Sequence, residues 1–434
     1  MNIRFYNARI LTMQEPVAVQ EHQQLWVSGE RIIYIGLGDA PEKIKEEKGL
    51  SGLSWDREID CGGNLLMPGF KDAHTHSAMV LFRSCADDEP LQGWLEKNIF
   101  PIEGKMTGED CYELTRLSVL EYLTSGVTAV FDMYLTPETI LEAFTDCGMR
   151  NVQVSGINNY GPEPEVMEER YLSLNGKNDL SSYMLGAHAE YTCSMELMEK
   201  IAAMVQKYKA PFFTHNSETI AEVEGCRSRW GKTPTQLWAD LGAYDFGGGG
   251  YHMVHMSEND FQICKDKKLT VVTNPASNLK LASGIAPIHR FLKEGIPVAI
   301  GTDGAGSNNC LDMFREMFLV TGLAKVKEQD ASVADGIEVL KMATVNGARA
   351  MGLKDSDVLA EGKYADLIMI DLQQPNMQPL HNIPKNIVYS GSKQNVVMTM
   401  IAGRILYDHG RFDIGVSPAE LYDKGNAIAE RLFR

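Results

Sequence analysis

The sequence lacks the features that mark membrane proteins and disulfide-bonded secreted proteins. No apolar run reaches the roughly 18 residues that a membrane-spanning helix needs, and the N-terminus, MNIRFYNARILTM, has no basic stretch followed by a long apolar segment. The eight cysteines are scattered and form no C-x-x-C pair, which favours reduced thiols over disulfides or a thiolate metal site. We therefore expect a cytoplasmic protein without a signal peptide.

Positive charge is also scarce, with 41 basic against 58 acidic residues and a formal net charge of -17. Such a surface repels phosphate backbones and anionic lipids, so we expect neither a nucleic acid nor a membrane as a partner. A small-molecule substrate and a homo-oligomeric assembly are expected instead. The chain is 44% hydrophobic and can bury a large core, which argues against a disordered protein.

Short strands are predicted near both ends of the chain. At the N-terminal end they cover residues 3–5, 25–27 and 31–35, and at the C-terminal end residues 365–370 and 396–401. We expect these strands to form one small β-sandwich domain, built from residues 1–64 and 355–434.

The middle of the chain, residues 65–354, alternates apolar strand candidates with helical segments. This alternation is typical of a parallel (β/α)8 or TIM barrel, an α/β fold of about 250 residues. Helices are predicted at 109–123, from the N-cap Thr136 and Pro137 to Gly148, and at 194–209. The eight strand candidates end near Asp72, Met133, Gly156, His188, His215, His255, Asn274 and Asp303.

Polar residues gather at the predicted C-terminal ends of these strands, where this fold places its active site. The motif D-A-H-T-H carries His74 and His76 two positions apart, so both imidazoles point to the same face of a strand. His215 and Asp303 follow the fifth and eighth strand candidates and complete a set of three imidazoles and one carboxylate. Imidazole suits zinc and iron, and this set leaves an open position for water, as catalytic metal sites do.

Further polar residues lie near this group in the predicted barrel. Glu218 follows His215 by three residues and can reach a metal-bound water without binding the metal. The sixth strand candidate ends in Y-H-M-V-H, in which we interpret His252 as the residue that polarises water or substrate and His255 as a supporting or core residue. His188, at the end of the fourth strand candidate, could face the substrate. The remaining histidines are interpreted as surface or packing residues: His22, His289, His381 and His409.

These motifs together resemble the amidohydrolase superfamily. D-A-H-T-H, F-T-H-N-S-E, H-M-V-H-M-S and G-T-D-G occur in the order and at the separations typical of that family, and the long block N-P-A-S-N-L-K-L supports them. Within the superfamily, the chain resembles the branch of S-adenosylhomocysteine/5′-methylthioadenosine deaminases and chlorohydrolases. The resemblance spans essentially the whole chain.

The resemblance implies a single divalent metal ion, Zn²⁺ or Fe²⁺, with four ligands: His74, His76, His215 and Asp303. No lysine follows the fourth strand candidate, so the carboxylated lysine that bridges two ions in other members is missing. Asp303 would then accept a proton from the attacking water. Glu218 would move protons to the ring nitrogen and the departing ammonia, and His252 would stabilise the attacking oxygen.

The resemblance also indicates residues for substrate binding. In nucleoside deaminases of this branch, the glutamate matching Glu103 binds the ribose hydroxyls and the histidine matching His188 contacts the substrate; we place Trp94 at the same site. Relatives that accept S-adenosylhomocysteine carry an arginine at the end of strand three, where this chain has Ser155. Arg170 could supply another basic group, but the serine favours neutral substrates such as adenosine or 5′-methylthioadenosine.

Three functions remain open at this point. The first is a deaminase of adenine-type nucleosides, a hydrolase of carbon–nitrogen bonds in cyclic amidines. The second is a guanine or pterin deaminase or a halotriazine chlorohydrolase on the same scaffold, and the third is a non-catalytic homologue. Glu218 favours the release of ammonia, which needs protonation, over that of chloride, which does not. The intact set of metal ligands argues against a non-catalytic homologue.

Overall fold

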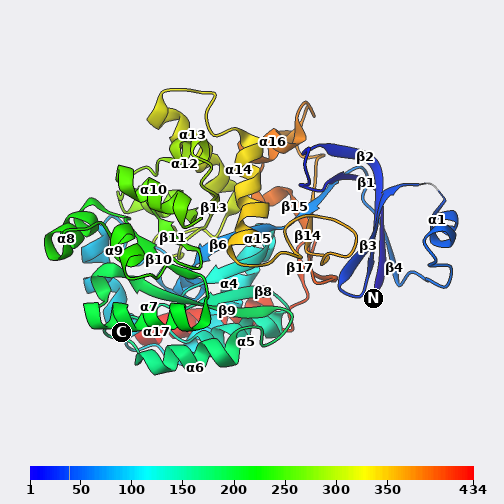
Figure 1. The fold of residues 1–434 in the computed structure, drawn as a ribbon. Helices are drawn as coiled ribbons and strands as arrows, with labels where there is room; N and C mark the ends of the chain where they lie inside the picture. Colours follow the sequence, from blue (N-terminus) through cyan, green and yellow to red (C-terminus); the bar gives the residue numbers. More distant parts are fainter. Residues whose placement is uncertain (39) are drawn as a thin grey trace.

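Eight parallel strands form the barrel that makes up the larger part of the protein (Figure 1). The computed structural model describes residues 1–38 and 40–434, and the strands follow one another around the barrel in sequence order. They are β6 (Phe70–Thr75), β7 (Val127–Asp132), β8 (Arg150–Val154), β9 (Ser181–Ala189), β10 (Phe212–Asn216), β11 (Gly248–His252), β12 (Thr270–Thr273) and β13 (Val298–Ile300). The predicted (β/α)8 barrel is confirmed.

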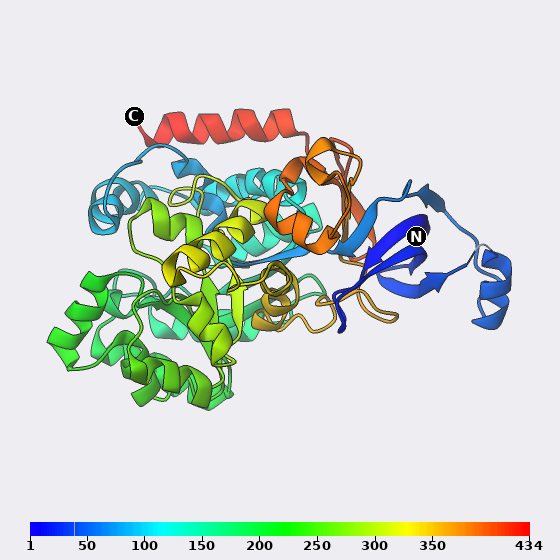
Figure 2. The same cartoon turned by 90° about the horizontal axis from the view of Figure 1, so that it is seen from above.

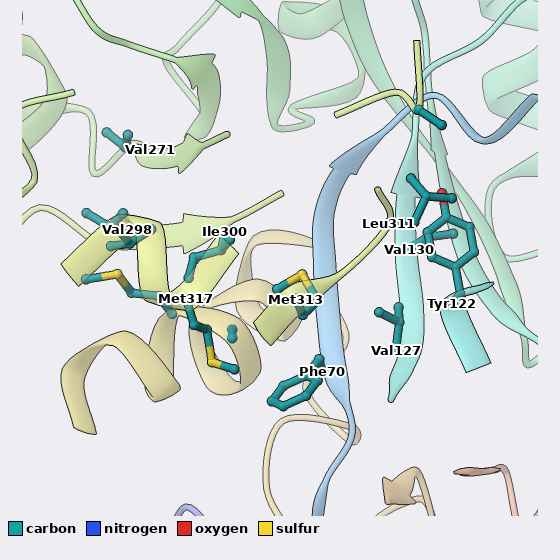
Figure 3. Close-up of a cluster of buried hydrophobic side chains, with 14 of the residues drawn as sticks. Phe70, Tyr122, Val127, Val130, Val271, Val298, Ile300, Leu311, Met313 and Met317 are labelled. Atoms are coloured by element: carbon teal, nitrogen blue, oxygen red, sulfur yellow. The ribbon is translucent and has the colours of Figure 1, made fainter. Parts of the chain in front are cut away.

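The barrel strands are apolar because both of their faces are covered. Every residue of β7 and of β10 is buried, as expected for a parallel sheet with helices outside and a packed interior. Inside the barrel, the ring of Phe213 lies against those of Phe131 and Tyr251, with centroids 4.9 and 5.8 Å apart. Outside it, Phe70 and Met313 belong to the cluster of apolar side chains that joins the strands to the helices (Figure 3).

Polar contacts join the first and the last strand of the barrel. The buried carboxylate of Asp72 accepts hydrogen bonds from the backbone amide and the hydroxyl of Thr302, at 2.8 and 2.5 Å. The backbone amide of Asp303 donates to the carbonyl of His74 at 2.8 Å. Burial raises the pKa of Asp72 to about 7, although the hydrogen bonds from Thr302 oppose the rise. These contacts bring the C-terminal ends of β6 and β13 together.

The helices surround the barrel (Figure 1). The main α-helices are α4 (Gly108–Thr124), α5 (Pro137–Cys147), α6 (Pro164–Leu174), α7 (Met195–Tyr208), α8 (Ile220–Trp230), α9 (Pro234–Asp240), α10 (Glu258–Asp266), α11 (Pro275–Lys280), α12 (Ile288–Lys293), α13 (Met313–Glu328) and α14 (Gly336–Lys341). Further helical segments are η1 (Ser77–Phe82), α2 (Leu91–Gly93), η2 (Trp94–Ile99), α3 (Phe100–Glu103), η3 (Glu190–Thr192), η4 (Met342–Asn346) and α15 (Gly347–Ala350). Within the residues described, no helix is both long and apolar enough to cross a membrane.

The predicted helix ends agree with α4, α5 and α7 to within one or two residues. Gly148 ends α5 in the left-handed conformation, with φ of 77°, which glycine adopts without a steric penalty. Thr136 is the N-cap residue of α5, as predicted. Its hydroxyl, however, lies 2.7 Å from that of Thr139 and makes no capping bond to a backbone amide.

Both ends of the chain form a nine-stranded mixed sheet beside the barrel (Figure 1). Its strands are β1 (Asn2–Leu11), β2 (Val19–Ser28), β3 (Arg31–Leu37), β4 (Arg57–Asp60), β5 (Leu65–Pro68), β14 (Leu367–Ile370), β15 (Val396–Ile401), β16 (Arg404–Asp408) and β17 (Arg411–Phe412). Helical segments beside them are α1 (Pro41–Glu47), η5 (Pro375–Met377), α16 (Ile383–Tyr389) and η6 (Lys393–Asn395). Ile3 and Leu25 share one buried cluster with Leu367 and Met398, so the prediction of one β domain from both termini is confirmed.

Two segments connect the terminal sheet with the barrel. Strand β5, which begins at Leu65, pairs with β1 and β14 in the terminal sheet. The last helix, α17 (Pro418–Leu432, red in Figure 2), packs against α4 of the barrel, where Lys424 lies 2.8 Å from Glu113. The division of the chain into residues 1–64 with 355–434 and residues 65–354 stays a prediction.

A buried ion pair fastens the terminal sheet to the barrel. The guanidinium of Arg150, on β8, donates to both carboxylate oxygens of Asp366, which precedes β14, at 2.7 and 3.2 Å. The hydroxyl of Ser356 and the amide of Ala402 donate to the same carboxylate at 2.6 and 2.7 Å. Burial would raise the pKa of Asp366, but Arg150 holds it below its usual value. The carboxylate is therefore charged and fully hydrogen-bonded.

We expect Asp366→Ala to lower the free energy of unfolding by about 3–5 kcal/mol, because it leaves the buried Arg150 without its counter-ion. Urea unfolding at neutral pH measures this change. The control is Asp355→Ala, which removes the exposed partner of Arg31 and should change stability much less, because solvent screens exposed pairs. A loss at position 366 no larger than that of the control would contradict the prediction.

Candidate metal centre and active site

A cavity of about 790 Å³ opens at the C-terminal ends of the barrel strands. It is the part of the barrel where this fold places its active sites. Ten of the eleven residues that the sequence singled out line it: His76, Trp94, Glu103, Ser155, Arg170, His188, His215, Glu218, His252 and Asp303. The eleventh, His74, is fully buried beside them. The structure thus brings all the predicted site residues to one place.

Four side chains beside the cavity form a cluster that could hold a metal ion. Each of them offers one ligand atom, and these atoms all lie within 4.8 Å of one another; the residues are His74, His215, His252 and Asp303. Neither ring nitrogen of His74 has a hydrogen-bond partner in the described part of the chain, although the ring is fully buried. A buried polar atom without a partner is costly, and a metal ion would supply that partner.

The rings of His76 and His215 are oriented by backbone carbonyls of neighbouring strand ends. Nδ1 of His215 lies 2.7 Å from the carbonyl oxygen of His188, and Nδ1 of His76 contacts that of Met133. A proton on each Nδ1 leaves the lone pair of Nε2 for a ligand. Nε2 of His76 lies 3.2 Å from Oδ1 of Asp303, next to the four-residue cluster. Its role as a metal ligand stays a prediction, since the cluster itself contains His252 instead.

Asp303 follows β13 and carries the only carboxylate of that cluster. Oδ1 accepts a hydrogen bond from the amide of Gly304 at 2.9 Å, and Oδ2 accepts one from the hydroxyl of Ser277 at 2.6 Å. Burial would raise the pKa of Asp303, but contact with His76 and the charges of His252 and His74 hold it well below its usual range. An ionised carboxylate at this place can bind a cation or accept a proton.

His252 lies between the two acidic groups of the site. Its Nε2 is 3.7 Å from Oε2 of Glu218 and 3.9 Å from Oδ2 of Asp303, and its Nδ1 is 2.7 Å from Oδ1 of Asn278. Strand β11 ends at His252, three residues earlier than predicted, because His252 and Met253 adopt positive φ angles and turn the chain.

His255 consequently does not belong to the strand end. It lies outside the cluster, with Nε2 2.7 Å from the carbonyl oxygen of Ser283. This contact agrees with its interpretation as a supporting residue.

Glu218 is buried at the floor of the cavity. Its Oε1 accepts a hydrogen bond from the hydroxyl of Ser283 at 3.0 Å. Burial raises the pKa of Glu218, and the carboxylate of Asp303 acts in the same direction, although His252 opposes both. A carboxyl group with a raised pKa in a cavity is suited to carry a proton in acid–base catalysis.

The predicted substrate residues lie around the wall of the cavity. Burial raises the pKa of Glu103, on α3, while contact with Tyr134 opposes the rise. Nδ1 of His188 is 3.1 Å from the hydroxyl of Thr192. Trp94 opens a π-helical turn, η2, an irregularity that is frequent at functional sites.

Arg170 lines the cavity, but its guanidinium already has an acidic partner. Nε and NH2 of Arg170 donate to the two carboxylate oxygens of Glu138 at 2.6 and 3.1 Å. It is the only lysine or arginine lining the cavity among the described residues. Ser155, also on the wall, is uncharged. Among the described residues, the cavity is therefore lined by no lysine or arginine that lacks an anionic partner.

The sequence did not point to several residues that orient the site. Asn278 holds the ring of His252, Ser277 bonds to Asp303, Ser283 bonds to Glu218, and the ring of Tyr251 stacks on that of His74 with centroids 3.8 Å apart. Ser277 and Asn278 lie in the N-P-A-S-N block whose resemblance was noted, which was the one available signal. Their partners are on other strands, so no local pattern could assign their roles.

Comparison with known proteins agrees with this geometry. A model of the amidohydrolase family matches residues 65–406. The chain belongs to the amidohydrolase family. It is 36% identical to a 5-methylthioadenosine/S-adenosylhomocysteine deaminase of Thermoanaerobacter pseudethanolicus, and the match covers 94% of both chains. It is 39% identical to the protein of the same name in Thermococcus onnurineus, and that match covers 84% of this chain and 87% of the other. An adenosine deaminase from Xanthomonas campestris, solved with bound zinc, superposes with a TM-score of 0.92 at 28% identity, covering 99% of this chain and 98% of that one.

We expect a divalent ion to stabilise the protein through His74. Addition of Zn²⁺ to protein treated with a chelator should raise the melting temperature, because a ligand that binds only the folded state shifts the unfolding equilibrium. His74→Ala should remove this rise. The control is His409→Ala, which changes an exposed histidine of the terminal sheet and should leave the response to zinc intact. An equal response in the two variants would contradict the prediction.

Proposed function

We propose that the protein is a metal-dependent deaminase that replaces the exocyclic amine of an adenine-type nucleoside with oxygen and releases ammonia. The observation that carries this proposal is Glu218, a buried acid with a raised pKa beside a cluster that could hold a metal ion. The names of the relatives in Thermoanaerobacter and Thermococcus and of the Xanthomonas structure support the same activity. An ammonia-release screen of the purified protein against aminated purines, nucleosides and pterins tests it.

We assign a single divalent ion to the site, Zn²⁺ or alternatively Fe²⁺, with four ligands: His74, His76, His215 and Asp303. Two observations support this set: the unpartnered ring nitrogens of His74 and the Nδ1 contacts that direct Nε2 of His76 and His215 toward Asp303. Such an ion supplies Lewis acidity that makes water a nucleophile near neutral pH. Zinc is bound in the Xanthomonas structure.

Different residues of the chain then carry out the proton transfers of the reaction. Water adds to the ring carbon that bears the amine, and the proton that it loses passes to Asp303. Glu218 protonates the adjacent ring nitrogen, then takes the remaining proton of the added hydroxyl and passes it to the amine as the carbon–nitrogen bond breaks, so that ammonia leaves and the carbonyl forms. The proton held by Asp303 returns Glu218 to its acid form. His252, held by Asn278 between both carboxylates, stabilises the oxygen that adds to the ring.

The wall of the cavity favours a substrate without a charged 5′ substituent. Apolar side chains form much of it, among them Leu95, Ile157 and Met167. Arg170, the one arginine or lysine among the described lining residues, is paired with Glu138. A substrate carboxylate buried here would lose its hydration without gaining an unpaired cation, which is unfavourable. We therefore propose adenosine or 5′-methylthioadenosine rather than S-adenosylhomocysteine as the preferred substrate, with Glu103 and His188 contacting the nucleoside beside Trp94 and Ser155.

The other hydrolases on this scaffold have less support. A halotriazine chlorohydrolase expels chloride, which needs no proton, so Glu218 would have no leaving group to protonate. A guanine or pterin deaminase remains the alternative that the ammonia-release screen would reveal. The homo-oligomeric state and the cytoplasmic location expected from the sequence stay predictions.

Glu218→Gln should keep its metal but lose roughly 10²–10⁴-fold in turnover, the range for removal of a general acid–base. Steady-state rates with adenosine or 5′-methylthioadenosine, together with metal analysis, measure both effects. Glu224→Gln provides the matched control, because Glu224 is exposed on α8, and it should retain the wild-type rate. Near wild-type turnover by Glu218→Gln would show that another group moves the protons.

For the wild type, we expect kcat/KM for adenosine or 5′-methylthioadenosine to equal or exceed that for S-adenosylhomocysteine. Ser155→Arg should shift the ratio toward the carboxylate-bearing substrate by about 10- to 150-fold, the range of a charge-assisted pair. The absorbance change on conversion of adenine to hypoxanthine rings measures all three rates. Ser155→Met controls for side-chain size without charge. A clear preference of the wild type for S-adenosylhomocysteine would refute this prediction and would mean that Arg170, despite Glu138, or another basic residue holds the carboxylate.

A further inference from the structure

A strained turn separates His215 from the helix that follows it. Ser217, between β10 and α8, has φ of 52° although it is not glycine, and this left-handed conformation costs free energy for a residue with a side chain. Glu218 is the next residue, so the turn sets the direction in which its side chain leaves the backbone. A strained turn persists only where surrounding contacts maintain it.

One buried carboxylate binds both amides of this turn. Oε1 of Glu222 accepts a hydrogen bond from the amide of Ser217 at 2.8 Å, and Oε2 accepts one from the amide of Glu218 at 2.7 Å. Glu222 is only 6% exposed, and within the described residues no lysine, arginine or histidine nitrogen lies within ion-pair distance of its carboxylate. Its polar partners are therefore backbone amides: those of Ser217 and Glu218 donate to it directly, and that of Thr219 also lies near it. On the other side, the carbonyl of Ser217 accepts from the amides of Val254 and His255 at 3.0 and 2.9 Å.

This arrangement differs from an ordinary helix cap. In the capping boxes of α4 and α10, the aspartate at the third helical position accepts from the N-cap residue itself: Asp110 from the amide of Thr107 and Asp260 from that of Ser257, both at 2.8 Å. Glu222 occupies the same position relative to its N-cap residue, Thr219. Its side chain is one methylene longer than that of aspartate, and it binds the amides of the two residues before the N-cap.

We propose that Glu222 is a positioning residue for Glu218: it holds the left-handed turn at Ser217 and so directs the Glu218 carboxylate toward Ser283 and His252. The carboxylate end of Glu218 is held by few contacts, since in the described part of the chain only the hydroxyl of Ser283 donates a hydrogen bond to it. The backbone direction therefore decides where the carboxylate lies. This inference rests on the proposed deaminase function, in which Glu218 moves the protons.

Glu222→Asp separates positioning from helix capping. The shorter carboxylate can accept from the amide of Thr219, as Asp110 and Asp260 do at their helices, but it no longer reaches the amides of Ser217 and Glu218. We expect the melting temperature and the zinc content to be retained. kcat should fall roughly 10- to 100-fold, since a displacement of about 1 Å in a catalytic group has an effect of this order. KM should change little, because Glu222 does not line the cavity.

Asp110→Asn is the control for loss of a capping box. It weakens both the cap of α4 and the pairing of Asp110 with Arg431 on α17, at a helix that contacts neither Glu218 nor its turn, so it should lower the melting temperature and leave kcat unchanged. Loss of stability with unchanged kcat is thus the result expected when a substitution disturbs a helix cap without moving Glu218. Wild-type kcat in Glu222→Asp would overturn the positioning role.

A crystal structure of Glu222→Asp decides the question independently of the substrate. If Glu222 positions Glu218, the Glu218 carboxylate in this variant should lose its hydrogen bond to Ser283, and Ser217 should leave the left-handed conformation. An unchanged contact between Glu218 and Ser283 would overturn it. If the wild-type protein released ammonia from no adenine nucleoside, the proposed function would fail, and this structural comparison would still test the role of Glu222.

Discussion

The closure of the barrel between β6 and β13 is the constraint on which the candidate site depends. Asp72, at one strand end, binds Thr302 at the other through two hydrogen bonds, and the amide of Asp303 binds the carbonyl of His74. These contacts fix the register of two segments that are about 230 residues apart in sequence. Because side chains alternate along a strand, a change of register would turn the ligands away from one another. The geometry of the cluster follows from this closure.

The remaining order in the site comes from hydrogen bonds between neighbouring strand ends. The carbonyl of His188 orients His215, and the side chain of Asn278 orients His252. Ser283 and Glu222 hold Glu218 from its two ends. The contacts of His188, Asn278 and Ser283 link different strands or the segments that follow them, whereas that of Glu222 lies within the turn between β10 and α8. Catalytic groups held in this way are positioned before substrate arrives, which lowers the reorganisation that the reaction requires.

The pairing of charged side chains decides which of them can meet a substrate in the cavity. The cavity contains acidic groups, but its one arginine, Arg170, is bound by Glu138. The sequence alone suggested that Arg170 could meet a substrate carboxylate. The structure shows the guanidinium engaged by a side chain from a different helix. Two residues from α5 and α6, far apart in any local pattern, thereby determine the charge available to the substrate.

The amino-acid sequence by itself determined the class of fold and the chemical groups of the site. Alternating strands and helices predicted the barrel, strands at both ends predicted the terminal sheet, and the family motifs predicted residues such as His74 and Asp303, because these signals are local in the chain. Only the tertiary structure decided that β11 ends at His252, that Arg170 is paired, and that Glu222 reaches the amide of Glu218. The pairing of Arg170 depends on a contact between separate helices, and the bonds of Glu222 depend on the backbone conformation of the turn at Ser217. Side-chain identity alone does not specify which partner is within reach.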